Sequence, residues 1–127
     1  MIVICGLPNA GKTTYSAQFE NVLHYDDILK YSRAERERIY QETDAECIEG
    51  IYNTAKSRRI LLEAIKDKPG KRVCIWIDTP ADECIRRENR GRHPSVVEHH
   101  ARIFQPPTYD EGWDEIIRIT AEETSAF

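Results

Sequence analysis

The sequence predicts an α/β fold in which a parallel five-stranded sheet, with strand order 2-3-1-4-5, lies between two layers of helices. Three observations support this prediction. Apolar runs alternate with helical patterns along the chain. The first apolar run leads through a glycine-containing loop into a helix, and the run at residues 72–78 is apolar on both faces, as a central parallel strand requires. A chain of 127 residues is expected to form one domain, residues 1–127.

The first half of the chain contains three expected strands. Residues 2–5 form the first, a helix follows over residues 13–20, and residues 21–25 form the second strand. Residues 28–42 have a charged helical pattern that predicts a mainly solvated helix, with a substrate contact by Lys30, Arg33 or Arg36 as the alternative. Residues 45–52 form the third expected strand, although Gly50 and two glutamates interrupt its pattern.

The second half continues the alternation. Asn53 and Thr54 cap a helix over residues 55–66, and a turn leads to the strand at residues 72–78, where Trp76 is expected in the core. Thr79 is expected to cap the next helix. Ser95 opens a capping box and a helix that runs to about residue 104. Residues 115–120 form the last strand, and residues 121–127 are expected to fray.

The segment from Gly6 to Thr13 fits the pattern G-x-x-x-x-G-K-[ST], between a strand and a helix. Its backbone N–H groups and the helix N-terminus favour phosphate binding. Lys12 is expected to reach the β- and γ-phosphates, and the Thr13 hydroxyl to bind Mg²⁺. The alternative, a glycine turn without nucleotide, leaves the flanking strand and helix unexplained. The motif predicts the fold of phosphate-loop (P-loop) NTPases, and the expected nucleotide contacts are Leu7, Pro8, Asn9, Ala10, Gly11, Lys12, Thr13 and Thr14.

Two further features fit a transfer reaction. Asp26 and Asp27 follow the second strand, so they serve either as helix-capping acids or as groups that face the phosphate loop. Four arginines lie between residues 86 and 92. They form either a solvated basic face or a lid over residues 86–94 whose guanidinium groups stabilise a transferred phosphate. An apolar third strand ending in aspartate is absent, and Glu49 is a candidate substitute that holds a magnesium-bound water.

The composition limits the choice of partners. The formal net charge is −4, which argues against tight, non-specific wrapping of nucleic acid. The four cysteines lack metal-ligand spacing and are expected to be reduced thiols in a cytoplasmic protein. The core strand starts within the first five residues and no apolar run reaches membrane-spanning length, so neither a signal peptide nor a membrane partner is expected.

The chain resembles the small P-loop kinases related to polynucleotide 5′-hydroxyl kinase. The resemblance covers residues 6–14, Tyr25-Asp26-Asp27, residues 76–80 with 84–90, and residues 104–116. It implies that Asp26 is the base on the attacking hydroxyl and also contacts the metal. It implies that Arg87 and Arg90 act in the lid, with Arg86 and Arg92 as further candidates. The chain departs from the family at Leu29, where that enzyme has an arginine that holds the substrate phosphate.

The function expected from these features is ATP- and Mg²⁺-dependent transfer of the γ-phosphate to a hydroxyl. Lys12, Asp26, Arg87 and Arg90 are the expected catalytic residues, and Thr13 and Asp26 the metal ligands. The acceptor that we expect is the 5′-hydroxyl of a polynucleotide. The alternatives are a nucleoside, nucleotide or other small molecule, or a nucleotide-binding module without transferase activity. ATP or GTP as donor and the oligomeric state stay open.

Overall fold

A computed structural model describes residues 1–124 of the chain. It contains one five-stranded parallel sheet with the order β2-β3-β1-β4-β5, as expected. The elements are β1 (Ile2–Gly6), α1 (Lys12–Ser16), β2 (Val22–His24), α2 (Tyr25–Ile28), α3 (Arg33–Glu42), β3 (Cys47–Glu49), α4 (Ala55–Ala64), β4 (Val73–Ile77), α5 (Ala81–Arg86), α6 (Ser95–Ile103), η1 (Tyr109–Glu111), β5 (Glu115–Ile119) and α7 (Ala121–Thr124).

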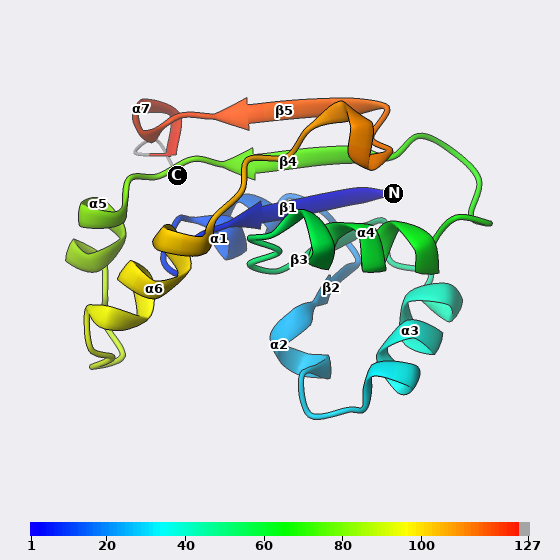
Figure 1. The fold of residues 1–127 in the computed structure, drawn as a ribbon, viewed down its shortest axis with the longest axis horizontal. Helices are drawn as coiled ribbons and strands as arrows, with labels where there is room; N and C mark the ends of the chain where they lie inside the picture. Colours follow the sequence, from blue (N-terminus) through cyan, green and yellow to red (C-terminus); the bar gives the residue numbers. More distant parts are fainter. Residues whose placement is uncertain (125–127) are drawn as a thin grey trace.

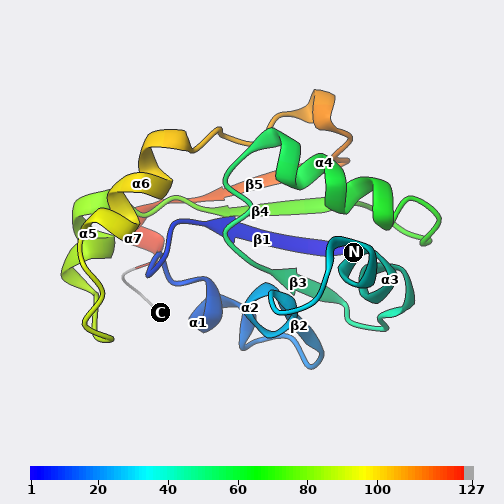
Figure 2. The same ribbon diagram turned by 60° about the horizontal axis from the view of Figure 1, so that its bottom comes forward.

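Helices cover both faces of the sheet, with α4 on one side and α1 on the other (Figures 1 and 2). Alternate residues of β1 explain the two layers, because Val3 packs with α3 and α4 while Ile4 packs with α5 and α6. The same alternation holds in β4, where Cys74 and Ile75 face opposite layers. Trp76, expected in the core, is half-buried and stacks on Phe104 at a centroid distance of 5.4 Å. The sheet is therefore covered on both faces, as its apolar strands predicted.

The charged helix expected over residues 28–42 begins only at Arg33, because residues 29–32 are not helical and Ser32 caps a new helix. The Ser32 hydroxyl accepts a hydrogen bond from the Glu35 backbone N–H and caps α3. The second strand ends at His24, one residue earlier than expected. Asp26 and Asp27 lie in the first turn of α2, where the helix dipole favours acids.

Several other boundaries differ from expectation. The first helix ends at Ser16, and the third strand is only Cys47–Glu49. Thr79 does not cap α5, since its hydroxyl donates to the Ala10 carbonyl, 2.8 Å away. Ser95 makes no capping box, since its hydroxyl lies 2.9 Å from His93 Nδ1 and Pro94 occupies the cap position. The helix with the arginines ends at Arg86.

The C-terminal expectation is corrected in part. Residues 121–124 form α7 and are not frayed, while the rest of the expected tail, residues 125–127, lies outside the described residues. All four cysteines are buried free thiols, as predicted. Within residues 1–124, no helix has the length and apolar character needed to cross a bilayer.

Candidate active site

The phosphate loop connects β1 to α1 and has the conformation that anion binding requires. Asn9 and Gly11 have positive φ angles of 65° and 107°, which turn the backbone sharply before α1. At Gly6, an added Cβ would lie 2.7 Å from the Ile77 carbonyl oxygen, so only glycine allows the loop to start this close to β4. The loop therefore lies at the carboxyl end of the central strand.

Lys12 is the first residue of α1 and its side chain is only 7% exposed. Its Nζ donates to the carbonyl oxygens of Gly6 and Leu7, at 2.9 and 2.7 Å. Burial lowers the pKa of Lys12, and the carboxylates of Glu49 and Asp26 partly offset that effect. The ammonium group is thus held across the loop, where a phosphate would take over its hydrogen bonds.

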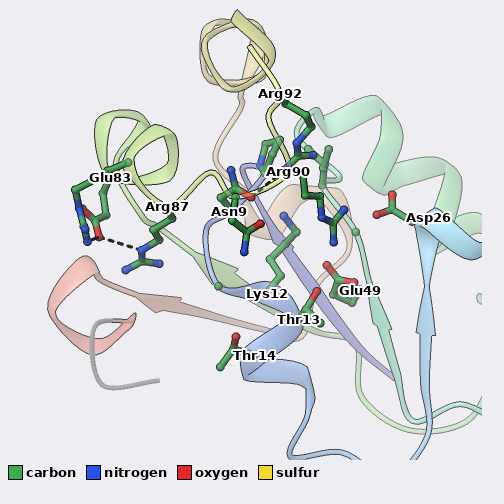
Figure 3. Close-up of a pocket in the computed structure, with 16 residues that line it drawn as sticks. Asn9, Lys12, Thr13, Thr14, Asp26, Glu49, Glu83, Arg87, Arg90 and Arg92 are labelled. Carbon is green, nitrogen blue, oxygen red and sulfur yellow. Dashed lines mark hydrogen bonds and ion pairs between the residues drawn. The ribbon is translucent and has the colours of Figure 1, made fainter. Parts of the chain in front are cut away.

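A cavity of about 600 Å³ opens over the loop, and Figure 3 shows Lys12 at its centre, with Asp26 and Arg87 on opposite sides. It brings together the predicted catalytic residues Lys12, Asp26, Arg87 and Arg90. Of the predicted loop contacts, Leu7 and Ala10 do not line it, because their side chains pack toward the core. The cavity is lined by Pro8, Asn9, Gly11, Lys12, Thr13, Thr14, Asp26, Glu49, Gly50, Ile51, Glu83, Arg86, Arg87, Asn89, Arg90 and Arg92.

Glu49 is the second carboxylate of the cavity, and the structure gives the register that its sequence pattern left open. It ends β3, opposite Ile4 in β1 and His24 in β2, and is 8% exposed. Its Oε2 lies 2.8 Å from His24 Nδ1, so the histidine holds the carboxylate at the edge of the sheet. Glu49 therefore lies at the carboxyl end of β3, with its carboxylate lining the cavity over the loop.

The residues around Thr13 fit a magnesium ion bound through phosphate. Thr13, Asp26 and Glu49 line the same cavity and supply oxygen atoms, the ligands that Mg²⁺ prefers. No group of three or more His, Cys, Asp or Glu side chains among residues 1–124 could hold a metal by itself. In proteins Mg²⁺ usually takes only one or two carboxylates together with phosphate oxygens and water.

Acidic residues hold the arginines after β4. Glu83 accepts hydrogen bonds from Arg86 and Arg87, which lower its pKa to about 2. Glu88 accepts from Asn9 and Arg92, and together with backbone N–H groups these lower its pKa to about 2. The sequence analysis missed Glu83 and Glu88, although their spacing of three and four residues from the arginines would have identified them.

The same segment is joined to the phosphate loop through Asn9. Asn9 Nδ2 donates to Cys84 O and to Glu88 Oε1, at 3.1 and 2.8 Å, and Arg92 donates to Asn9 Oδ1 at 2.8 Å. Arg87 Nη1 donates to the Ala10 carbonyl at 3.2 Å. Two of the arginines are therefore positioned by the loop that they face.

A second cavity, of about 390 Å³, lies beside the first, and Asp26 and Ile51 line both. Gly50 lies at the boundary between them. A Cβ at Gly50 would lie 2.6 Å from Tyr52 Cε2 and 2.9 Å from Tyr25 Cβ, so the absent side chain lets these two tyrosines pack together. The glycine that interrupts the third strand pattern thus forms part of the wall between the cavities.

Residues 104–113 support this wall from behind. The side-chain oxygen of Gln105 accepts a hydrogen bond from the Ala55 backbone N–H at 2.8 Å. The backbone N–H of Gln105 donates to the Asn53 carbonyl at 2.7 Å. Glu111 forms a bidentate ion pair with Arg58, and Arg58 Nη1 donates to the Tyr52 carbonyl at 2.8 Å. This support gives a structural reason for a stretch that helix and strand patterns do not explain.

The fold matches that of several solved proteins, among them two kinases. A gluconokinase from Sinorhizobium meliloti 1021 superposes with a TM-score of 0.68 at 14% identity, over 98% of this chain and 85% of that chain. Kti12 from Chaetomium thermophilum, in complex with ADP-AlF3, superposes with a TM-score of 0.67 at 14% identity, over 98% of this chain and 93% of that chain. The Mycobacterium tuberculosis APS kinase CysC, in complex with AMPPNP and APS, superposes with a TM-score of 0.58 at 18% identity, over 98% of this chain and 93% of that chain.

No protein-family model matches the chain, and no curated protein matches it. At the identities of the solved structures, the likeness establishes the fold alone. The chain has the fold of P-loop kinases, with the sheet order and loop that its sequence predicts.

Proposed function

We propose that this chain is an ATP- and Mg²⁺-dependent kinase that transfers the γ-phosphate to the hydroxyl of an acceptor. The position of Asp26 carries the proposal, because this carboxylate lines both the phosphate-loop cavity and the adjoining one. A group at that boundary can accept the proton of a hydroxyl in one cavity as it attacks a phosphate in the other. The solved neighbours bound to ADP-AlF3 and AMPPNP support a nucleotide in the first cavity.

Each charged group then has a role in the transfer. Lys12 and the loop amides hold the β- and γ-phosphates, and Arg87 and Arg90 face the charge that spreads over the transferred group. Mg²⁺, held through Thr13 with Asp26 and Glu49 nearby, would neutralise phosphate charge when bound. Arg90 is an exposed residue of the cavity rim, so a nucleotide can recruit its guanidinium.

The acceptor has two candidate classes. The resemblance in sequence favours the 5′-hydroxyl of a polynucleotide, whereas neighbours such as the gluconokinase and a sugar kinase from Janibacter sp. HTCC2649 are named for carbohydrates. The dimensions of the second cavity favour a small molecule, since about 390 Å³ lies at the lower end of the range for small-ligand pockets, roughly 300–1,000 Å³.

The test is transfer of labelled phosphate from ATP to a panel of nucleosides, sugars and 5′-hydroxyl oligonucleotides. Asp26→Asn should lower kcat by about 10²–10⁴-fold, the usual contribution of a general base. Asp27→Asn is the matched control, because Asp27 is exposed and lines neither cavity. Equal rates for Asp26→Asn and wild type contradict the assignment of the base, and ATP binding without transfer to any acceptor favours a binding module.

A further inference from the structure

The second cavity has a lining whose chemistry limits the acceptor. It lies between α2, α3 and α4, and its apolar and aromatic lining consists of Tyr25, Leu29, Tyr40, Ile51, Tyr52, Ile60 and Leu61. Tyr25 and Tyr52 pack edge to face at a centroid distance of 5.6 Å, which fixes the orientation of both rings. A rigid aromatic wall of this kind binds flat, apolar groups.

Most of the uncharged polar side chains that line the cavity already have hydrogen-bond partners in the protein. The hydroxyls of Tyr40 and Tyr52 lie 2.8 Å apart, and Asn53 Nδ2 lies 2.9 Å from His100 Nδ1. The Ser57 hydroxyl donates to the Thr54 carbonyl at 2.7 Å. An acceptor with many hydroxyls would therefore find few uncharged partners for them, and each hydroxyl that is buried without a partner costs free energy.

Leu29 is an apolar side chain that the protein leaves exposed. It is 56% exposed although it lines the cavity. An acceptor ring placed against Leu29 would remove this surface from water, which is favourable.

The charges around the cavity balance. Its lining contains two positive side chains, Arg33 and Arg36, and two negative ones, Asp26 and Glu37. Arg36 already has a partner, because its Nη1 donates to the Tyr31 carbonyl at 2.6 Å. A polynucleotide site needs an excess of positive charge along the phosphate backbone. The cavity has no such excess, so a polymer is disfavoured as the acceptor.

We propose that the acceptor is a small molecule with an aromatic ring and a single reacting hydroxyl, the ring lying against Leu29 and the tyrosine wall and the hydroxyl directed to Asp26. This proposal rests on the kinase function proposed above. In the reaction the acceptor oxygen forms a bond to the γ-phosphorus as its proton passes to Asp26. The bond from that phosphorus to the bridging oxygen breaks, and ADP leaves with the electron pair.

Binding, measured without turnover, tests this proposal separately from the kinase function. The probes are benzyl alcohol and thymidine as ring-bearing compounds with one and two hydroxyls, with ribose, gluconate and a 5′-hydroxyl decanucleotide for comparison. Each is titrated calorimetrically into the protein saturated with AMPPNP and Mg²⁺. We expect at least one ring-bearing probe to bind more tightly than ribose, gluconate and the decanucleotide. Leu29→Ala should weaken the binding of that probe by about five- to tenfold.

Ile103→Ala is the control, because Ile103 is a 43% exposed apolar residue outside both cavities, and it should leave the binding unchanged. The proposal is overturned if ribose, gluconate or the decanucleotide binds more tightly than every ring-bearing probe, or if no ring-bearing probe binds. It is also overturned if Leu29→Ala and Ile103→Ala have the same effect. Failure of phosphate transfer in the separate labelling assay would instead count against the kinase function and leave the binding result to stand on its own.

Discussion

Replacing Glu111 by glutamine removes the negative charge of the ion pair behind the second cavity. The Arg58 and Glu111 side chains are 0% and 1% exposed and are joined by two hydrogen bonds, of 2.7 and 3.0 Å. Trp113 Nε1 also donates to this carboxylate at 3.1 Å. The substitution keeps the shape of the side chain and leaves the Arg58 guanidinium buried without its counter-charge.

The magnitude follows from that burial. Removing one partner of a buried pair costs about 3–5 kcal/mol, because the remaining charge stays out of water. For 127 residues, an unfolding entropy of about 2.1 cal/mol/K per residue gives about 270 cal/mol/K, so the loss lowers Tm by about 10–20 °C. Exposed pairs are worth about 0–1 kcal/mol. Glu63→Gln, in the exposed Lys66 pair, is therefore the matched control.

Urea unfolding followed by tryptophan fluorescence measures both variants. We expect Glu111→Gln to lose several kcal/mol and Glu63→Gln to stay within about 1 kcal/mol of wild type. The double variant Arg58→Met with Glu111→Leu should recover most of the loss, because it buries no charge. A Glu111→Gln protein within 1 kcal/mol of wild type refutes the reasoning.

The pH dependence of stability gives an independent test of the same ion pair. Burial alone would raise the pKa of Glu111, but the Arg58 and Trp113 hydrogen bonds outweigh it and hold the pKa below its usual 4.5. The folded pKa is thus depressed, so this contribution to stability is present above about pH 4.5 and is lost as pH falls through the folded value. The difference between wild type and Glu111→Gln should therefore shrink on acidification from pH 7 to pH 3, and a constant difference contradicts the assignment.

Two further substitutions test the walls of the site. Gly50→Ala places a Cβ 2.6 Å from Tyr52 Cε2, so it should displace the tyrosine wall and raise the acceptor KM by about tenfold while the KM for ATP changes little. Steady-state kinetics with both substrates varied check this, and an unchanged acceptor KM contradicts it. Asn9→Ala removes the bonds that hold the Glu88–Arg92 segment to the loop, so trypsin should cut after Arg90 or Arg92 several-fold faster, as mass spectrometry would show. Equal cleavage rates contradict this coupling.

Much of the fold was predictable because its signals are local. The loop motif and the two-sided apolar pattern of residues 72–78 placed β1 and β4 correctly, and the rules for crossover connections then predicted the strand order. The break between α2 and α3 was also readable, since Ser32 and Glu35 have the spacing of a capping box. The prediction of one helix over residues 28–42 overlooked this capping signal, because the charged helical pattern continues across it.

The active site was predictable only in part, because its walls depend on long-range contacts. Asp26 follows the second strand, so its position made it a candidate site residue and the family resemblance made it a candidate base, and it lines both cavities. Glu83 and Glu88 act through the arginines they hold, which local spacing could have indicated. The contact of Thr79 with Ala10 spans 69 positions, and no sequence pattern announces it.

Gly50 shows why a weak pattern can indicate a functional site. A regular third strand would continue its alternation of apolar side chains through residues 50–52, and a side chain at Gly50 would collide with Tyr25 and Tyr52. The chain instead ends β3 at Glu49, and Tyr52 takes a φ of 39°, which Arg58 supports through the Tyr52 carbonyl. The strand therefore loses regularity where it positions a carboxylate for one cavity and an aromatic ring for the next.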